Sequence, residues 1–328
     1  MANCTKEKAL EVTTKYLDRE WEKIKQIEFP KTLEREITKK DLTSEVSNLI
    51  RKNVSEEGIN YTRNNSKIVK YFNNSLKFAN RKGSDSPYDY WQKLKEDKDL
   101  FHKFYQNRIR CSDWYKEKDN MKYIDDGYVP EQIYGIGLTT SMKAPYVSYF
   151  KPIFAKYLIN KYLGEFDTVF DPFTGFGGRL LGTLSLGKNY IGYDINDAVI
   201  KENSEIYEFW KEVSPNTKST VQLVCKDSLK EDGTQEEYDC LFTCPPYGDL
   251  EQWRTLDGSL VKCDLNCDDI IDVVLKKYKC KKYVFVVDNK IQKYKNKVAE
   301  ELGNFSYIKS RNKDTTNCNT AEYIVVIE

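Results

Sequence analysis

The stretch that most constrains the fold runs over residues 165–194, EFDTVFDPFTGFGGRLLGTLSLGKNYIGYD. Residues 168–170 are a short apolar, β-prone run that ends on Asp171. A glycine-rich turn follows, then helical spacing over residues 179–184, and then a second strand-like run that ends on Asp194. A strand, a glycine turn, a helix and a strand ending on an acid make up the first half of a nucleotide-binding α/β unit.

This layout predicts where a ligand binds. In open parallel sheets, ligands lie beyond the carboxyl ends of the strands, where glycines allow positive φ and a close approach of the backbone. An acid at the end of the second strand, as Asp194 is, can accept hydrogen bonds from ribose hydroxyls. The dinucleotide fingerprint G-x-G-x-x-G is incomplete, because Leu180 stands where the third glycine belongs.

A second motif, T-C-P-P-Y at residues 243–247, follows another strand-like run at residues 238–242. Together with D-P-F-T-G-F-G-G at residues 171–178, it resembles the loops of the S-adenosylmethionine-dependent DNA amino-methyltransferases, the N4-cytosine and N6-adenine enzymes. Those loops read D-P-F-x-G-x-G and [DNS]-P-P-[YFW], and here they stand in the same order at strand ends. The N-terminal third of the chain lies outside the resemblance.

The resemblance implies an α/β, Rossmann-like methyltransferase domain with a mostly parallel seven-stranded sheet, preceded by an α-helical N-terminal region. We expect residues 1–130 to form the helical region, with a role in DNA binding or target recognition, and residues 131–328 to form the methyltransferase domain. Further strands are expected at residues 219–225 and 283–287, with 306–308 and 322–327 as a closing pair. Helices are expected at residues 6–27, 41–50, 66–72, 145–163, 197–213 and 268–278.

The resemblance also implies a site for S-adenosylmethionine at the strand ends. The expected cofactor-binding residues are Asp171, Phe173, Thr174, Gly175, Gly177, Asp194, Asp227 and Ser228. In the family, the glycine loop cradles the cofactor, the acid after the second strand holds the ribose, and a polar residue after the third strand faces the adenine. The alternative to an adenine-facing role for Asp227 is that it is an ordinary acidic residue in the turn after the strand.

The T-C-P-P-Y loop is expected to be catalytic, with Cys244, Pro245, Pro246 and Tyr247 handling a base flipped out of double-stranded DNA. The lone pair of an exocyclic amine is delocalised, so acceptors must hold its N–H groups while the nitrogen attacks. Prolines donate no N–H and stiffen the loop, and Tyr247 would stack on the base. Cys244 departs from the family's Asp, Asn or Ser, because a thiol is a weak acceptor.

We therefore expect a site-specific DNA methyltransferase, with cytosine N4 favoured slightly over adenine N6. Two alternatives stay open. One is an RNA base methyltransferase, for instance on guanine N2. The other is a catalytically inactive methyltransferase fold that binds nucleic acid, which the unusual Cys244 keeps under consideration.

A basic stretch lies in the N-terminal region, where no acid occurs between Glu57 and Asp85. Its candidate nucleic-acid-binding residues are Arg63, Lys67, Lys70, Lys77, Arg81 and Lys82. Clustered cations on a helical segment are typical of a phosphate-binding face. Two short helices around residues 57–60 loosely resemble a helix-turn-helix. The alternative is a solvated helix face.

Composition argues against several other classes. The 328 residues are 31% charged with a net charge of +1, which indicates a globular protein. No apolar run approaches the roughly 18 residues of a membrane helix, and the N-terminus lacks a secretion signal, so an intracellular protein is expected. Cys263, Cys267 and Cys280 lack the spacing of a complete zinc site, so no metal is expected. The single histidine, His102, lies in a helical run and disfavours a histidine-based hydrolase.

Overall fold

The computed structural model describes residues 6–29, 37–54, 66–111, 147, 149–230, 233–248, 251–302 and 322–328. The chain forms two compact units, one from residues 1–37 and 77–147 and the other from residues 38–76 and 148–328. The predicted boundary at residue 130 lies outside the described residues, so the division into 1–130 and 131–328 stays a prediction. Residues 38–76 fall within the predicted N-terminal region, but in the structure they belong to the same unit as residues 148–328.

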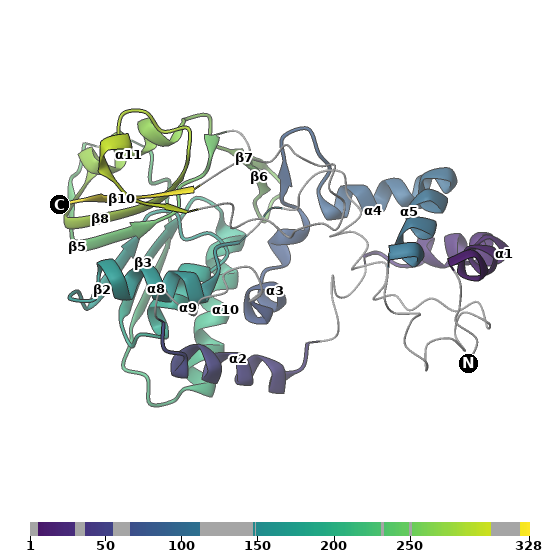
Figure 1. Ribbon diagram of the computed structural model, residues 1–328, viewed down its shortest axis with the longest axis horizontal. Coiled ribbons are helices and arrows are strands. Elements are labelled where there is room, and N and C mark those ends of the chain that lie inside the picture. The colour runs from purple at the N-terminus through teal and green to yellow at the C-terminus, as the bar shows by residue number, and fades with distance from the viewer. Residues whose placement is uncertain are drawn as a thin grey trace. The chain divides into compact units, whose positions relative to one another are not determined.

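The first unit is mainly helical. Its elements are α1 (Lys6–Lys25), β1 (Asn80–Arg81), α4 (Pro87–Glu96) and α5 (Lys98–Cys111) (Figure 1). Ser86 caps α4 by accepting a hydrogen bond from the third residue after it, and a proline follows at the first helical position. The fully buried Trp91 donates its indole N–H to the carbonyl of Ile27 at 3.3 Å, which ties α4 to the end of α1. None of the described helices is both long and apolar enough to cross a membrane.

The second unit contains a seven-stranded sheet. Its order is β4 (Val221–Cys225), β3 (Asn189–Asp194), β2 (Thr168–Asp171), β5 (Glu236–Thr243), β8 (Tyr278–Asp288), β10 (Glu322–Ile327) and β9 (Val298–Leu302). The first five strands are parallel, and β10 is antiparallel to both of its neighbours. The predicted α/β, Rossmann-like fold with a mostly parallel seven-stranded sheet is confirmed. Within the closing pair, residues 306–308 lie outside the described part, and β9 is the strand beside β10.

Helices cover both faces of this sheet. They are α8 (Pro152–Tyr162), α9 (Gly178–Leu184), α10 (Asp197–Val213) and α11 (Cys267–Lys277), and Figure 1 shows α11 on the opposite side of the sheet from the other three. Successive strand residues point to opposite faces: Val169 and Phe242 pack with α8, whereas Phe170 and Leu241 pack with α11. Because both faces are buried there, the runs at residues 169–170, 240–242 and 283–287 are continuously apolar. A hairpin of β6 (Glu251–Arg254) and β7 (Leu260–Lys262) follows β5, and a short 3₁₀ turn (Lys295–Lys297) precedes β9.

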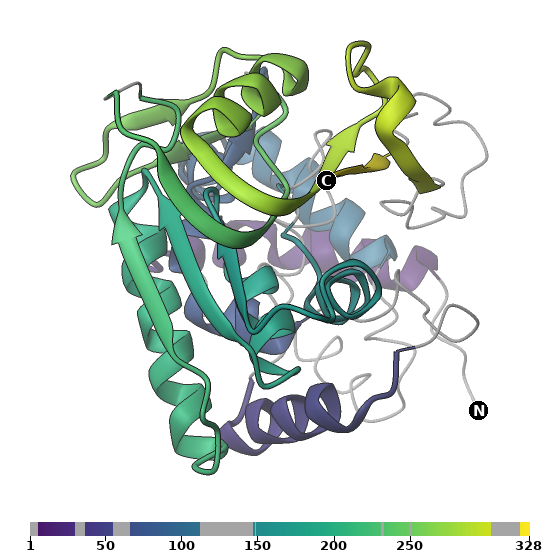
Figure 2. The ribbon, with the colours of Figure 1, turned by 90° about the vertical axis from the view of Figure 1, so that its left-hand side faces the viewer.

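Residues 38–76 include α2 (Lys39–Arg51), α3 (Lys67–Phe72) and all but the last residue of a 3₁₀ turn (Asn74–Lys77). Figure 2 shows α2 close to one end of α10. The buried Lys156 of α8 donates hydrogen bonds to the carbonyls of Leu49, Ile50 and Lys52 at 2.7–2.9 Å. These bonds satisfy carbonyls that have no partner within a helix end. Local sequence patterns carried no sign of this packing, because its partners lie more than a hundred residues apart.

A buried carboxylate also holds the end of this segment. Glu202 on α10 accepts hydrogen bonds from the backbone N–H of Ser75 at 2.8 Å and from the Ser75 hydroxyl. The side chain of Glu202 is almost inaccessible to solvent, and burial raises its pKa from 4.5 to about 7. Residues 74–76 are thus fixed to α10 by a group that titrates near neutral pH.

Replacing Glu202 should change how stability depends on pH. Because the folded-state pKa is higher than the unfolded value, the unfolded chain loses its proton first as the pH rises. The free energy of unfolding should therefore fall between pH 4.5 and 7, by about 3 kcal/mol from this group alone. Glu202→Gln should remove that part of the slope in urea unfolding followed from pH 4 to pH 8. Glu208→Gln, at an exposed position of α10, is the matched control, and equal slopes in the two variants would contradict the assignment.

Candidate active site

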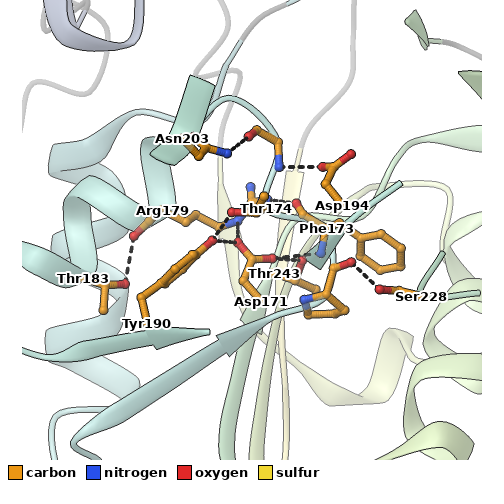
Figure 3. Close-up of polar contacts among 12 residues, drawn as sticks. Asp171, Phe173, Thr174, Arg179, Thr183, Tyr190, Asp194, Asn203, Ser228 and Thr243 are labelled. Atoms are coloured by element: carbon orange, nitrogen blue, oxygen red, sulfur yellow. Dashed lines mark hydrogen bonds and ion pairs between the residues drawn. The ribbon is translucent and has the colours of Figure 1, made fainter. Parts of the chain in front are cut away.

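The carboxylate of Asp171, at the end of β2, is the centre of a buried polar network (Figure 3). It is fully buried and forms an ion pair with Arg179 Nε at 2.6 Å. Hydroxyl groups of Tyr190 and Thr243 donate to it, each at 2.7 Å, and the backbone N–H of Phe173 donates at 3.2 Å. Asp171 thereby joins β2, β3, β5 and α9, and its oxygens are engaged by protein groups and not directed at a ligand.

The electrostatics of this network agree with its geometry. Burial alone would lower the pKa of Arg179, but the adjacent carboxylate of Asp171 more than offsets this and holds the pKa above its usual value. Burial, and then the same carboxylate, raise the pKa of Tyr190 well above 10. Arg179 is therefore a cation and Tyr190 a neutral hydrogen-bond donor at physiological pH.

The glycine loop between β2 and α9 has the backbone conformation that glycine requires. Gly175 has φ +54° and Gly177 has φ +79°, a region that other residues rarely adopt. A Cβ at Gly177 would lie 2.3 Å from the side-chain oxygen of Asn203 on α10. The amide of Asn203 donates to the carbonyl of Gly175 at 2.7 Å, so α10 supports the loop from behind.

Asp194, at the end of β3, lies against the same loop. Its carboxylate accepts hydrogen bonds from the backbone N–H groups of Gly175 and Asn196, both at 2.9 Å. Burial raises its pKa from 3.8 to about 6, although these two donors favour the ionised form. The loop is also held by the backbone N–H of Thr174, which donates to the carbonyl of Tyr193 at 2.8 Å. Asp194 thus lies beside the predicted cofactor loop at the edge of the sheet.

The end of β4 reaches the loop as well. Ser228 is buried and donates its hydroxyl to the carbonyl of Pro172 at 2.7 Å, while Asp227 accepts from the backbone N–H of Leu229 at 2.9 Å. Phe173 packs, partly buried, against the apolar cluster under α11. Seven of the eight predicted cofactor residues therefore lie in or against one loop, with Ser228 acting there as a support. The hydrogen bond of Asp227 lies within its own turn, so its role beside the adenine stays a prediction.

The predicted catalytic loop begins where β5 ends, one residue after the Thr243 that is bonded to Asp171. Cys244 Sγ lies 3.4 Å from the hydroxyl of Tyr247, and that hydroxyl donates to Glu322 of β10 at 3.1 Å. Burial raises the pKa of the Cys244 thiol to about 12, and the negative charge of Glu322 acts in the same direction. The thiol is therefore protonated at neutral pH and is not a thiolate nucleophile.

The predicted basic residues are divided between the two units. Arg63 lies outside the described residues, as does the turn at residues 57–60. Lys67 forms an ion pair with Asp41 at 2.5 Å, and burial together with the nearby charge of Lys151 lowers the pKa of Lys70 to about 8. The helix carrying Lys67 and Lys70 ends at Phe72, and the remaining cations, Lys77, Arg81 and Lys82, belong to the other unit. The helix ends at the residue that the sequence predicted, and the role of these cations in nucleic-acid binding stays a prediction.

Sequence reasoning missed several residues of the site. Arg179, Tyr190 and Thr243 complete the Asp171 network, and Glu322 reaches Tyr247 from 75 positions along the chain. One signal was present for Arg179, since a charged residue stands at the start of a helix that is otherwise apolar. For Glu322 no local pattern exists, because only the order of the strands brings β10 to the loop.

Among known proteins, this chain has similarity only to solved structures, at low sequence identity. No family model matches the sequence, and no curated protein matches it. Similar solved structures include an S-adenosylmethionine-dependent methyltransferase from Agrobacterium tumefaciens (15% identity, 44% of this chain and 45% of that chain, TM-score 0.31). They also include a putative RNA methyltransferase from Pyrococcus horikoshii (12% identity, 53% and 81%, TM-score 0.35). A third is the tRNA (uracil-54, C5)-methyltransferase of Pyrococcus abyssi in complex with S-adenosyl-L-homocysteine (13% identity, 56% and 41%, TM-score 0.36). The matched part spans less than half of the first and third of these chains.

Removing the charge of Asp171 should destabilise the second unit strongly. Asp171→Asn leaves the buried cation of Arg179 without its counter-charge, so the free energy of unfolding in urea should fall by about 3–5 kcal/mol. Adding Arg179→Met should recover part of that loss, because no buried charge then remains. Asp239→Asn breaks an exposed ion pair with Lys281 and should have little effect. A loss as small as that of the control would show that the buried pair does not organise the unit.

Proposed function

We propose that this protein is an S-adenosylmethionine-dependent methyltransferase that modifies an exocyclic amine of a base in double-stranded DNA, with cytosine N4 slightly favoured over adenine N6. The observation that carries the proposal is the 2.7 Å hydrogen bond between Thr243 and Asp171. It ties the start of the Pro-Pro-Tyr loop to the start of the glycine loop. A cofactor on one loop and a base on the other would then be held in fixed relative positions, which is what an in-line transfer needs.

The residues of the glycine loop fit a nucleoside cofactor. Gly175 and Gly177 present backbone without side chains, and Asp194 has lone pairs beyond the two that its backbone donors use. These lone pairs would accept hydrogen bonds from ribose hydroxyls, with Asp227 beside the adenine. Phe173 and Thr174 would line the same loop. Asp171 and Ser228 would support the conformation of this loop through their hydrogen bonds to its backbone.

The Pro-Pro-Tyr loop fits a flipped base. Bound S-adenosylmethionine would supply a sulfonium methyl group: the amine lone pair forms the new N–C bond, the C–S electron pair stays on sulfur, and one N–H proton leaves. Pro245 and Pro246 stiffen the loop so that carbonyls face the amine, and Tyr247 supplies the stacking surface. The Cys244 side chain and a backbone carbonyl would hold the amine hydrogens.

The N-terminal helical unit is proposed to contribute to nucleic-acid binding. Lys77, Arg81 and Lys82 are the predicted cations that this unit carries. In the second unit the charge of Lys67 is balanced by Asp41, so its contribution to phosphate binding is expected to be smaller.

Methyl transfer from labelled S-adenosylmethionine tests the proposal directly. The full-length protein should label duplex DNA, and digestion to nucleosides with mass analysis should give a methylated cytosine or adenine amine. Tyr247→Ala should lower transfer by about a hundredfold or more, since it removes base stacking worth about 1–3 kcal/mol and disturbs the amine's position. Its affinity for the cofactor should be unchanged.

Other labelling patterns would change the proposal. Label in RNA alone would replace DNA by RNA as the substrate. Cofactor binding without transfer to either polymer would favour the inactive fold with Cys244 at its centre. If Tyr247→Ala lost both cofactor binding and methyl transfer, that result would contradict the division of roles between the two loops.

The pH dependence of cofactor affinity tests the role of Asp194. An ionised carboxylate accepts ribose hydroxyl hydrogens, whereas a protonated one loses acceptor capacity. Because its pKa is about 6, affinity for S-adenosylhomocysteine measured by calorimetry should fall as the pH drops from 7.5 to 5. Asp194→Asn should bind about tenfold more weakly at pH 7.5, with little dependence on pH over this range. Unchanged affinity in this variant would contradict the assignment.

A further inference from the structure

The hydrogen-bond chain from Cys244 through Tyr247 to Glu322 has only one consistent direction. A tyrosine hydroxyl has a single hydrogen, and an ionised carboxylate can only accept. The hydroxyl of Tyr247 donates to Glu322 at 3.1 Å, so it has no hydrogen left for the sulfur 3.4 Å away. In that contact the thiol of Cys244 must therefore be the donor and the tyrosine oxygen the acceptor.

This direction changes what the sulfur can do. The thiol has one hydrogen, which points at Tyr247, so the sulfur lone pairs face away from that contact. Each bond in such a chain polarises the next one, and a carboxylate at the end makes the preceding oxygen more electron-rich. The high pKa of Cys244, about 12, keeps its hydrogen in place at neutral pH. The sulfur can thus accept a hydrogen bond at position 244, where the family's motif has Asp, Asn or Ser and this protein has cysteine.

We propose that Glu322 is a positioning residue that, acting through Tyr247, orients the Cys244 thiol so that its sulfur accepts a hydrogen of the target amine. This inference rests on the proposed function and adds to it a residue of β10 that the two sequence motifs do not contain. Without Glu322 the tyrosine hydroxyl is free to donate to the sulfur. The acceptor would then be occupied and the amine no longer held in place.

Three variants test the chain through methyl transfer. Glu322→Ala and Tyr247→Phe should each lower kcat by about tenfold or more, since each removes a charge-assisted hydrogen bond. KM for the nucleic acid should change by no more than about twofold, because the stacking ring is retained. The double variant should be no slower than the slower single variant, since both changes break one chain. Losses that multiply, or a kcat of Glu322→Ala equal to wild type, would overturn the proposal.

A rescue experiment distinguishes an effect of Glu322 on the orientation of the thiol from a general structural role of Glu322 in β10. Cys244→Asp supplies its own oxygen acceptor, so Glu322→Ala in that background should alter kcat by less than about twofold. The matched control is Glu300→Ala on the neighbouring strand β9, which removes an acceptor 3.0 Å from the hydroxyl of Tyr162. It should leave kcat unchanged. Equal effects of the Glu300 and Glu322 changes, or no rescue by Cys244→Asp, would show that Glu322 only stabilises the sheet.

A spectroscopic measurement tests the chain without turnover. The S–H stretching band of Cys244, isolated as the infrared difference between wild type and Cys244→Ala, should lie at the lower frequency of a donating thiol. It should move to higher frequency in Tyr247→Phe and in Glu322→Ala. An unshifted band would reject the chain itself. A shifted band in a protein that transfers no methyl group would keep the chain and reject the proposed function.

Discussion

The buried ion pair between Asp171 and Arg179 is the interaction on which the rest of the site depends. Both charges are withdrawn from water. Their attraction offsets the desolvation cost only when further hydrogen bonds satisfy the remaining lone pairs of the carboxylate. Tyr190 from β3, Thr243 from β5 and the backbone at Phe173 provide those bonds. Three strands and the helix after the glycine loop thereby share one charged group, and the positions of two loops far apart in sequence become coupled.

Around this centre the fold supplies rigidity from both sides. Apolar side chains alternate between the two sheet faces, so the strand ends that carry the polar residues are fixed by well-packed cores. Asn203 of α10 supports the glycine loop, and residues 38–76 are bonded to α8 and α10 through Lys156 and Glu202. The second unit therefore includes helices that precede the sheet by about a hundred residues in sequence.

The sequence predicted those features that local pattern determines. The runs that became β2, β3 and β5, the glycine turn and the helix at residues 197–213 were recognisable because apolar spacing and turn glycines are short-range signals. The partners of Asp171 were not, since Thr243 reaches it from 72 residues away through the sheet order. No local pattern indicated that Asn73, the residue that ends α3, donates a hydrogen bond to the carbonyl of Phe176 in the glycine loop, 103 residues away. The sequence showed only that Cys244 departs from the family motif, because its connection to Glu322 through Tyr247 depends on the strand order.

Hydrogen–deuterium exchange with and without S-adenosylhomocysteine tests most directly whether the two loops form one site. The ligand should slow amide exchange at residues 173–179 and 194–196, where the backbone would contact or support it. Because Asp171 connects Thr243 to the glycine loop, slower exchange should extend to the amides of Cys244, Tyr247 and Gly248 even without nucleic acid. Saturable binding that leaves the glycine loop unprotected, or protects it with no change in the Pro-Pro-Tyr loop, would contradict this account of the site.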